Sequence, residues 1–261
     1  MTDLELKHYG VKGMKWGVRR YQNPDGSLTE AGRNRVKGAN RKSKLIKEQL
    51  GLSVNKKTFY KHDKKASKSL TVKKGSSVYH VTPKDFKSLR EGQDLFVSAT
   101  NKDRDTYKAF LTLMMRHKGF GMDTPIKEVA FKLKTTLKST SNDQQRRIFE
   151  STYEKNKGIF DSDIDSYYKT KNKTRPSDNY DAFIKTLDGK SSNSKNKFYD
   201  AMKERGYNAV LDQHDVTGSW MQAQRPLIVM DAINTLGDIK VKSINESDIL
   251  DSLKRLNVIG I

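Results

Sequence analysis

The sequence predicts an α+β fold preceded by a basic N-terminal arm. Short strand-like runs, such as VYHVT at 78–82 and LFVS at 95–98, are interspersed with helical segments without the regular spacing of βαβ units. Hydrophobic residues make up 34% of the chain, below the roughly 45% that is usual in globular proteins, so part of the chain is expected to be extended. The net charge of +20 is uneven, because residues 1–75 contain 20 Lys and Arg against 6 Asp and Glu.

These patterns divide the chain into three parts. Residues 1–32 form a Gly-rich, cationic segment that contains the turn signal NPDG. Residues 33–75 form a basic helical arm and a linker; the helix is capped by Thr29, runs to Leu50 and ends at Gly51. Because its apolar positions are sparse, we expect this helix to be marginal without a partner. Residues 76–261 form the α+β domain.

The domain contains segments with clear strand or helix patterns. The expected strands are 78–82, 95–98, 128–133, 209–211, 227–231 and 239–243. The expected helices are 85–90, 103–117, 143–153, 179–187, 195–206 and 246–256. Residues 212–225 are expected to form a loop that holds Trp220.

The residue types present exclude several classes of protein. No Walker loop, dinucleotide fingerprint or metalloprotease motif occurs, and the lack of cysteine excludes disulfides and thiolate metal sites. No apolar run approaches the ~18 residues of a membrane span, and the N-terminus has no signal-peptide core. The five histidines are scattered, and we interpret His214 with Asp212 and Asp215 as a solvated turn, so we expect no metal site.

The basic arm favours an anionic partner, such as nucleic acid, an acidic protein surface or a membrane face. A solvated tail that only aids solubility is the alternative interpretation. A non-specific nucleic-acid-binding protein would need little more than this arm, with aromatic side chains for base stacking. The candidates for stacking are Trp16, Tyr21, Phe59 and Tyr60.

The run HYGVKGMKWGVRRYQNPDGSLTEAG at residues 8–32 resembles a segment of structural and head-associated proteins of tailed phages, and of related mobile elements, of Gram-positive bacteria. That segment occurs joined to different downstream domains, so the resemblance implies a docking or address element. Its glycines would let an extended chain lie close to a surface, where aromatic anchors and cations find partners. The predicted partner-binding residues are His8, Lys12, Met14, Lys15, Trp16, Arg19 and Arg20.

A second resemblance covers about residues 76–244. A strand with His-x-Thr, a second strand ending in Ser98, a helix carrying Tyr107 and a late strand after a loop follow the order of the ADP-ribosyltransferase fold, in its His-Tyr-Glu variant. Residues at about 135–195 are an unmatched insert. In that family the His holds the nicotinamide ribose of NAD and the Tyr stacks on the nicotinamide ring. The resemblance implies NAD as cofactor, bound by His80, Thr82, Ser98 and Tyr107.

The catalytic position departs from this family. A Glu just before a late strand stabilises the family's oxocarbenium-like transition state, whereas Gln222 or Gln224 stands at that position here. A neutral amide cannot supply the negative charge, and losing such an electrostatic contribution typically costs ~10²–10³ in rate. The resemblance therefore implies a transferase-like fold with catalysis weakened or lost, which leaves enzymatic activity open.

We therefore expect a phage virion protein, head- or tail-associated, whose basic arm docks to other virion proteins or to packaged DNA. It would be found in the virion or in the host bacterial cytoplasm, and the particle would set its oligomeric state. Two alternatives stay open: an NAD-dependent mono-ADP-ribosyltransferase acting on a host macromolecule, and a non-specific nucleic-acid-binding protein.

Overall fold

A computed structural model describes residues 21, 23, 25–60, 67–119, 125–187 and 191–260. The predicted partner-binding residues between His8 and Arg20 lie outside the described residues. The described residues form a mixed α+β structure, which confirms the expected fold class.

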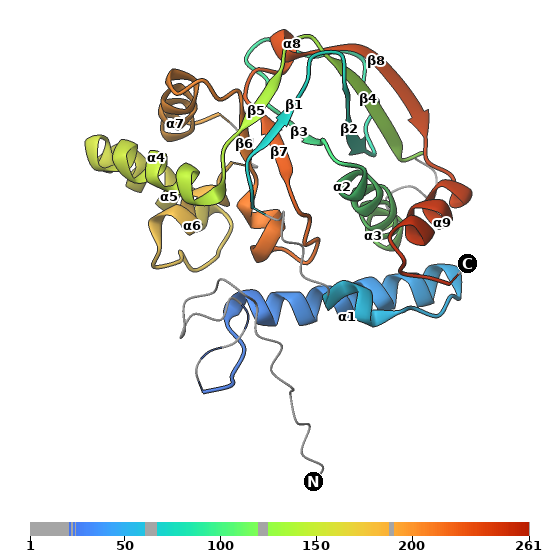
Figure 1. Ribbon diagram of the computed structural model, residues 1–261. Helices are drawn as coiled ribbons and strands as arrows, with labels where there is room; N and C mark the ends of the chain where they lie inside the picture. The colour runs from blue at the N-terminus through green and yellow to red at the C-terminus, as the bar shows by residue number, and fades with distance from the viewer. Residues whose placement is uncertain are drawn as a thin grey trace.

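A six-stranded sheet forms the centre of the fold (Figure 1). Its order is β6-β7-β3-β2-β4-β8, and every neighbouring pair is antiparallel. The strands are β2 (Ser77–Thr82), β3 (Leu95–Ser98), β4 (Lys127–Leu133), β6 (Ala209–Leu211), β7 (Pro226–Val229) and β8 (Leu236–Ser243). A separate antiparallel pair joins β1 (Leu70–Val72) to β5 (Leu137–Ser139).

Side chains alternate between the two faces of the sheet, as expected for strands. On β2, Val78 packs into a cluster with Phe131 and Leu137, which we call the strand-pair cluster because β5 belongs to it. Val81, three residues later, faces the opposite side and packs with Tyr107. The helices α2 (Asn101–Thr106), α3 (Thr112–His117) and α9 (Glu246–Arg255) cover that side.

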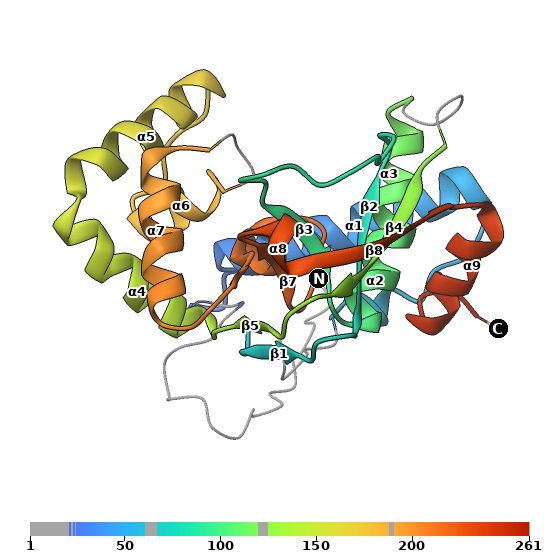
Figure 2. The ribbon, with the colours of Figure 1, turned by 90° about the horizontal axis from the view of Figure 1, so that it is seen from above.

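A helical lobe lies to one side of the sheet, opposite α9 (Figure 2). It consists of α4 (Asn142–Lys155), α5 (Lys157–Thr170), α6 (Asn179–Ile184) and α7 (Asn193–Glu204). Its core is aromatic: the ring of Phe149 lies 5.0 Å from that of Phe183 and 5.4 Å from that of Phe160. Val210 and Ile228 of the sheet belong to the same cluster, so the lobe and the sheet are packed together.

The long helix α1 (Glu30–Leu50) runs beneath α2 and α3 (Figure 1). Thr29 caps its start by accepting from the Gly32 amide, and Gly51 ends it in the left-handed conformation at φ 66°, as the sequence predicts. Leu45 and Ile46 are buried against the body. A Cβ on Gly38 would come within 2.7 Å of the Trp220 carbonyl oxygen, so this position requires glycine for the close approach of helix and loop.

Residues expected to form a basic arm and linker therefore include structured elements that contact the body. The 3-10 turn η1 (Lys56–Tyr60) follows α1 and contacts it, and α1 also contacts α3. The strand β1 also lies within the expected linker. Burial of an amphipathic stripe compensates for the low intrinsic stability of such a polar helix. None of the described helices has the length and apolar character needed to span a membrane.

The structure differs from the expected elements at several places. The expected loop at 212–225 contains a π-helical turn, η3 (His214–Gly218). Residues 85–90 are not helical, because Phe86 packs edge-on against Phe131 at 5.3 Å and this contact overrides the weak helix preference of so short a segment. The expected helix 103–117 is interrupted by a π-helical turn, η2 (Tyr107–Leu111). Helix α5 was not predicted, although Phe160, Ile164 and Tyr168 repeat every four residues on its buried side.

Candidate functional site

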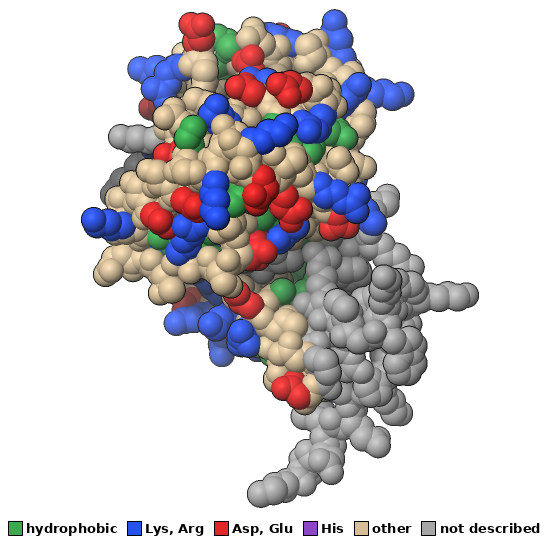
Figure 3. Space-filling view, turned by 90° about the vertical axis from the view of Figure 1, so that its left-hand side faces the viewer, with side chains coloured by type: hydrophobic (Ala, Val, Ile, Leu, Met, Phe, Trp, Pro, Cys, Tyr) green, Lys and Arg blue, Asp and Glu red, His purple; other side chains and the backbone are tan. Residues whose placement is uncertain are grey.

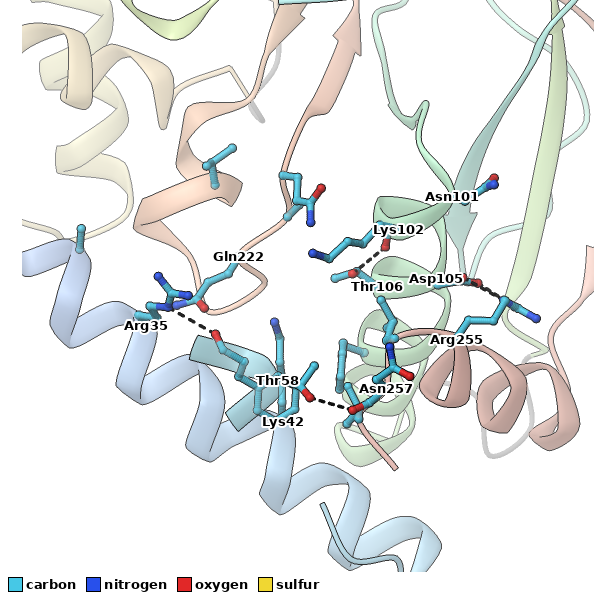
Figure 4. A pocket seen from close by; sticks show the side chains of 18 of the residues that line it. Arg35, Lys42, Thr58, Asn101, Lys102, Asp105, Thr106, Gln222, Arg255 and Asn257 are labelled. Atoms are coloured by element: carbon cyan, nitrogen blue, oxygen red, sulfur yellow. Dashed lines mark hydrogen bonds and ion pairs between the residues drawn. The ribbon is translucent and has the colours of Figure 1, made fainter. Parts of the chain in front are cut away.

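The strongest candidate site is a pocket of about 480 Å³ between α1, η1, the start of α2, the end of α9 and the loop before β7 (Figure 4). This volume lies within the range of roughly 300–1,000 Å³ that is usual for small-molecule sites. The pocket draws residues from segments more than 200 positions apart, from Tyr21 to Val258. We call it the α1 pocket.

One wall of the α1 pocket is apolar. Phe59 of η1 and Phe110 of η2 line it, with their ring centroids 5.9 Å apart in an edge-to-face arrangement. Thr58 holds η1 to the C-terminal segment, because its hydroxyl donates to the Asn257 carbonyl oxygen at 2.7 Å. The wall is therefore built from three chain segments that tertiary contacts bring together.

The charges that line the α1 pocket are mostly positive. Four basic side chains, Arg35, Lys42, Lys102 and Arg255, face one carboxylate among the described lining residues, Asp105. Arg255 donates from Nε and Nη2 to the two Asp105 oxygens at 2.9 and 2.7 Å, so this pair is bidentate. Of the other three, Arg35 and Lys102 add positive charge and Lys42 is held partly neutral by burial, so the described lining still carries more positive than negative charge.

Arg35 is held in place at the pocket wall. Its Nε donates to the Phe59 carbonyl oxygen at 3.3 Å, and its guanidinium lies 4.5 Å from the centre of the Tyr21 ring. The hydrogen bond and the cation–π contact together favour one position of the guanidinium at the pocket wall.

Lys42 is almost fully buried in the same region. Its ammonium donates to the Met221 carbonyl oxygen and lies 4.9 Å from the Phe110 ring centre. Burial lowers the pKa of Lys42 from 10.5 to about 7, although the charge of Asp215 acts in the opposite direction. The amine is therefore partly neutral at physiological pH, which is unusual for lysine.

This pKa predicts a pH-dependent stability. Between about pH 7 and 10.5 the unfolded chain carries a proton on Lys42 and the folded chain does not. The destabilisation that results from burying Lys42 is therefore largest below pH 7 and decreases as the pH rises. We expect the free energy of unfolding of the wild type to gain roughly 3 kcal/mol relative to Lys42→Met between pH 6.5 and 9.5. Urea unfolding at both pH values measures this, with the exposed Lys44→Met as the control. The prediction would be contradicted if the free energy of unfolding of Lys42→Met changed with pH in the same way as that of Lys44→Met.

The buried carboxylate of Asp103 holds the loop before β7 in place. Asp103 of α2 is fully buried; its oxygens accept from the main-chain amides of Gln224 and Arg225 at 2.7 and 3.1 Å and from the Thr100 hydroxyl at 2.7 Å. Burial raises the pKa of Asp103, against the effect of these hydrogen bonds. The loop backbone therefore has a defined position at the pocket.

Both predicted catalytic-position residues line the α1 pocket. Gln222 adopts a left-handed backbone with φ 53°, which is uncommon for a residue with a side chain. Gln224 is 9% exposed, and its Nε2 is buried without a hydrogen-bond partner among the described residues. An unpaired buried amide donor costs about 1–3 kcal/mol, and an acceptor that formed a hydrogen bond with it would remove that cost.

The predicted NAD-binding residues lie elsewhere. His80, Thr82, Ser98 and Tyr107 are not among the residues that line the α1 pocket. On β2, His80 lies on the same face of the sheet as Val78. Val81 lies on the opposite face, and Tyr107 packs against that face.

Three of these four side chains, those of His80, Thr82 and Tyr107, have hydrogen-bond partners nearby, and Ser98 is buried. His80 Nδ1 lies 2.9 Å from the Phe96 carbonyl oxygen, and burial lowers the pKa of His80 although that hydrogen bond opposes the shift. The Thr82 hydroxyl accepts from the Lys84 amide at 3.1 Å, and Ser98 is buried at the end of β3 opposite Tyr79.

Tyr107 is buried at the start of η2. Its hydroxyl donates to Asp215 Oδ2 at 2.6 Å, and its ring lies edge-on to Phe96 at 4.9 Å. Burial first, and then the negative charges of Asp215 and Asp212, raise the pKa of Tyr107. This hydrogen bond joins η2 to the π-helical turn after β6, residues His214–Gly218. Gln222 and Gln224 therefore share a pocket, and the four predicted NAD-binding residues are not brought into it.

Sequence reasoning missed Arg35, Lys42 and Asp103 as site residues. Lys42 and Arg35 belong to a helix studded with cations, and the signal available was periodicity: Lys42, Ala39 and Ile46 lie on the buried side, at spacings of three and four. Asp103 carried an N3 capping signal after Thr100, but nothing local shows that its carboxylate reaches a loop 121 positions away.

Comparison with known proteins concerns the N-terminal segment. A family model described as "Family of unknown function (DUF7211)" matches residues 1–23. No curated protein and no solved structure matches the chain. The matched residues belong to the predicted docking segment and end before α1 begins.

Proposed function

We propose that the chain is a virion-associated protein of a tailed phage, which docks to another virion protein through its N-terminal segment and to packaged DNA through α1. One observation carries the proposal: the side of α1 that faces away from the body is a continuous row of cations. The row, which we call the α1 basic face, consists of Arg33, Lys37, Arg41, Lys44 and Lys47, all exposed.

The geometry of this row suits a nucleic-acid backbone. The residues are spaced by four, four, three and three positions, which places them on one side of a helix about 30 Å long. Lys44 has a weak ion pair with Glu48 at 3.6 Å, and Arg41 lies over the Trp220 ring at 4.5 Å. Cations aligned at this spacing can each neutralise a phosphate and release its counterion.

The charge on another face of the molecule is mixed. Over the helical lobe, acidic and basic side chains are interspersed (Figure 3). There, Arg175 pairs with Asp161 and Asp165, and Arg146 pairs with Asp178. Internal pairing of this kind leaves little net field, which supports α1 rather than the lobe as the side that meets DNA.

The docking part of the proposal is supported by the confinement of the family match to residues 1–23. A segment that occurs joined to different downstream domains is expected to give a family match that ends before the folded body begins. The resemblance of residues 8–32 to a segment of head-associated phage proteins indicates the class of partner.

Two variants separate the two contacts. Neutralising Arg33, Lys37, Lys44 and Lys47 to Gln should weaken duplex DNA binding and reduce the slope of log K against log salt by about three to four. Fluorescence anisotropy across a salt series measures this, with the exposed lobe residues Lys155, Lys169, Lys171 and Lys173 changed to Gln as the charge-matched control. Equal binding by the two variants would refute the DNA contact.

Deletion of residues 1–20 should abolish incorporation into particles and leave DNA affinity largely unchanged. The deletion spares Tyr21, which packs on Arg35. Immunoblots of purified particles against the free lysate measure incorporation, and circular dichroism checks that the body stays folded. Wild-type incorporation of the truncated chain would refute the docking role.

The transferase hypothesis stays a prediction. Gln222 and Gln224 occupy a pocket wall, as a catalytic position would, but His80 lies on the other side of the sheet from Tyr107 and neither lines that pocket.

A further inference from the structure

We propose that the α1 pocket binds an organic phosphate whose body is a planar aromatic ring system, such as a mononucleotide. The site is distinct from the α1 basic face, because Arg35 and Lys42 project from the side of the helix that meets the body. The inference therefore stands or falls independently of the DNA contact.

The first argument is the unsatisfied donor of Gln224. The Gln224 main chain is held by Asp103 at 2.7 Å, so the side chain starts from a rigid base. The residue is 9% exposed, lines the pocket, and its Nε2 is buried with no partner among the described residues. A ligand oxygen that reaches Gln224 Nε2 would satisfy this donor.

The second argument is the sign of the charge. Arg35, Lys42 and Lys102 line the pocket, and its carboxylate, Asp105, is already engaged by Arg255. The guanidinium of Arg35, which lies 4.5 Å from the Tyr21 ring centre, has forked donors suited to phosphate. The acceptor that Gln224 requires is therefore best supplied by an anion.

The third argument concerns the rest of the ligand. Phe59 and Phe110 give the pocket an aromatic wall, and Val216 and Leu256 extend its apolar lining. A volume of about 480 Å³ exceeds what a bare phosphate fills and suits a small organic molecule. A phosphate attached to a planar ring would meet both the charged and the apolar parts of the lining.

The test is calorimetric titration of the full chain with AMP, adenosine and inorganic phosphate. We expect AMP to bind, and each of the two fragments to bind at least about 10-fold more weakly, because each meets only part of the lining. Adenosine binding as tightly as AMP would overturn the phosphate assignment. Phosphate binding as tightly as AMP would overturn the aromatic one, and no AMP binding at millimolar concentration would overturn the site.

Variants locate the binding. Arg35→Gln and Gln224→Met should each weaken AMP binding about 10-fold, whereas Lys44→Gln, which removes a charge from the outer side of the same helix, should leave it unchanged. Lys102→Gln serves as a second pocket variant on an exposed residue, should Arg35→Gln destabilise the fold. Wild-type affinity in the pocket variants, with near-UV circular dichroism showing them folded, would place AMP elsewhere and refute the proposal.

Discussion

Replacing Glu128 by Ala is expected to lower the free energy of unfolding by about 3–5 kcal/mol. Glu128 is buried in β4 and accepts from Arg104 Nε and Nη2 at 2.9 and 2.6 Å. The Lys108 ammonium, itself buried, lies 2.9 Å from Oε2, the oxygen that also accepts from Arg104 Nε. Removing the carboxylate would leave Lys108 buried without its counter-charge, which is the most costly way to break an ion pair.

The three residues form a cross-link between the sheet and the helices beneath it. Burial alone would raise the pKa of Glu128, but the hydrogen bonds from Arg104 and Lys108 outweigh burial and hold it below its usual value. Because the folded pKa is lowered, this stabilisation is present above about pH 4.5 and is lost as the pH falls through the folded pKa. The difference between wild type and Glu128→Ala should therefore shrink in acid.

Urea unfolding at neutral pH and near pH 3 measures both effects. Asp85→Ala is the matched control. Asp85 pairs with Lys127, the β4 residue next to Glu128, but Asp85 is exposed on the surface. Surface pairs contribute little, so Asp85→Ala should unfold as the wild type does. An equally small change for Glu128→Ala would show that the buried cluster adds no stability.

Replacing Asp103 by Ala is expected to lower the free energy of unfolding by about 3–4 kcal/mol, and to loosen the loop that carries Gln222 and Gln224. The change leaves the buried amide of Gln224, the amide of Arg225 and the Thr100 hydroxyl without their acceptor. Each buried donor that loses its partner costs about 1–3 kcal/mol, partly recovered where water can enter.

Asp181→Ala provides the control for this change. Asp181 stands at the same position of its helix, three residues after an N-cap, but its carboxylate is half exposed and pairs with Arg146 at 3.0 Å. We expect it to cost less than about 1 kcal/mol. Hydrogen exchange at the Gln224 and Arg225 amides supplies the local measurement. Unchanged protection of those amides in Asp103→Ala would contradict the anchoring role.

Local signals predicted most of the elements of the domain. Thr29 and Gly51 delimit α1 as the sequence predicts, because a hydroxyl cap and a left-handed glycine act within a few residues of the chain. The alternation of Val129, Phe131 and Leu133 likewise predicted β4. Errors occurred where local preference is weak, as at residues 85–90, where the packing of Phe86 decides the backbone.

The predicted site residues do not share one pocket, and their roles stay predictions. Gln222 and Gln224 were singled out from their place before a late strand, and both line the α1 pocket. His80 and Tyr107 do not line that pocket: side-chain alternation along β2 places His80 on the face opposite Val81, and Tyr107 is buried in η2 against Asp215. A linear order of motifs does not contain that information.

The class of fold, the basic character of α1 and the distinct N-terminal segment follow from the amino-acid sequence alone, since each depends on composition, periodicity or a run of neighbouring residues. Three features emerge only from the folded chain: α1 packs on the body, Lys42 is buried beside Phe110, and Asp103 holds the loop of Gln224. These contacts join residues far apart in the chain. Their energies arise from burial and from hydrogen bonds in a low-dielectric interior, which exist only after the segments have packed together.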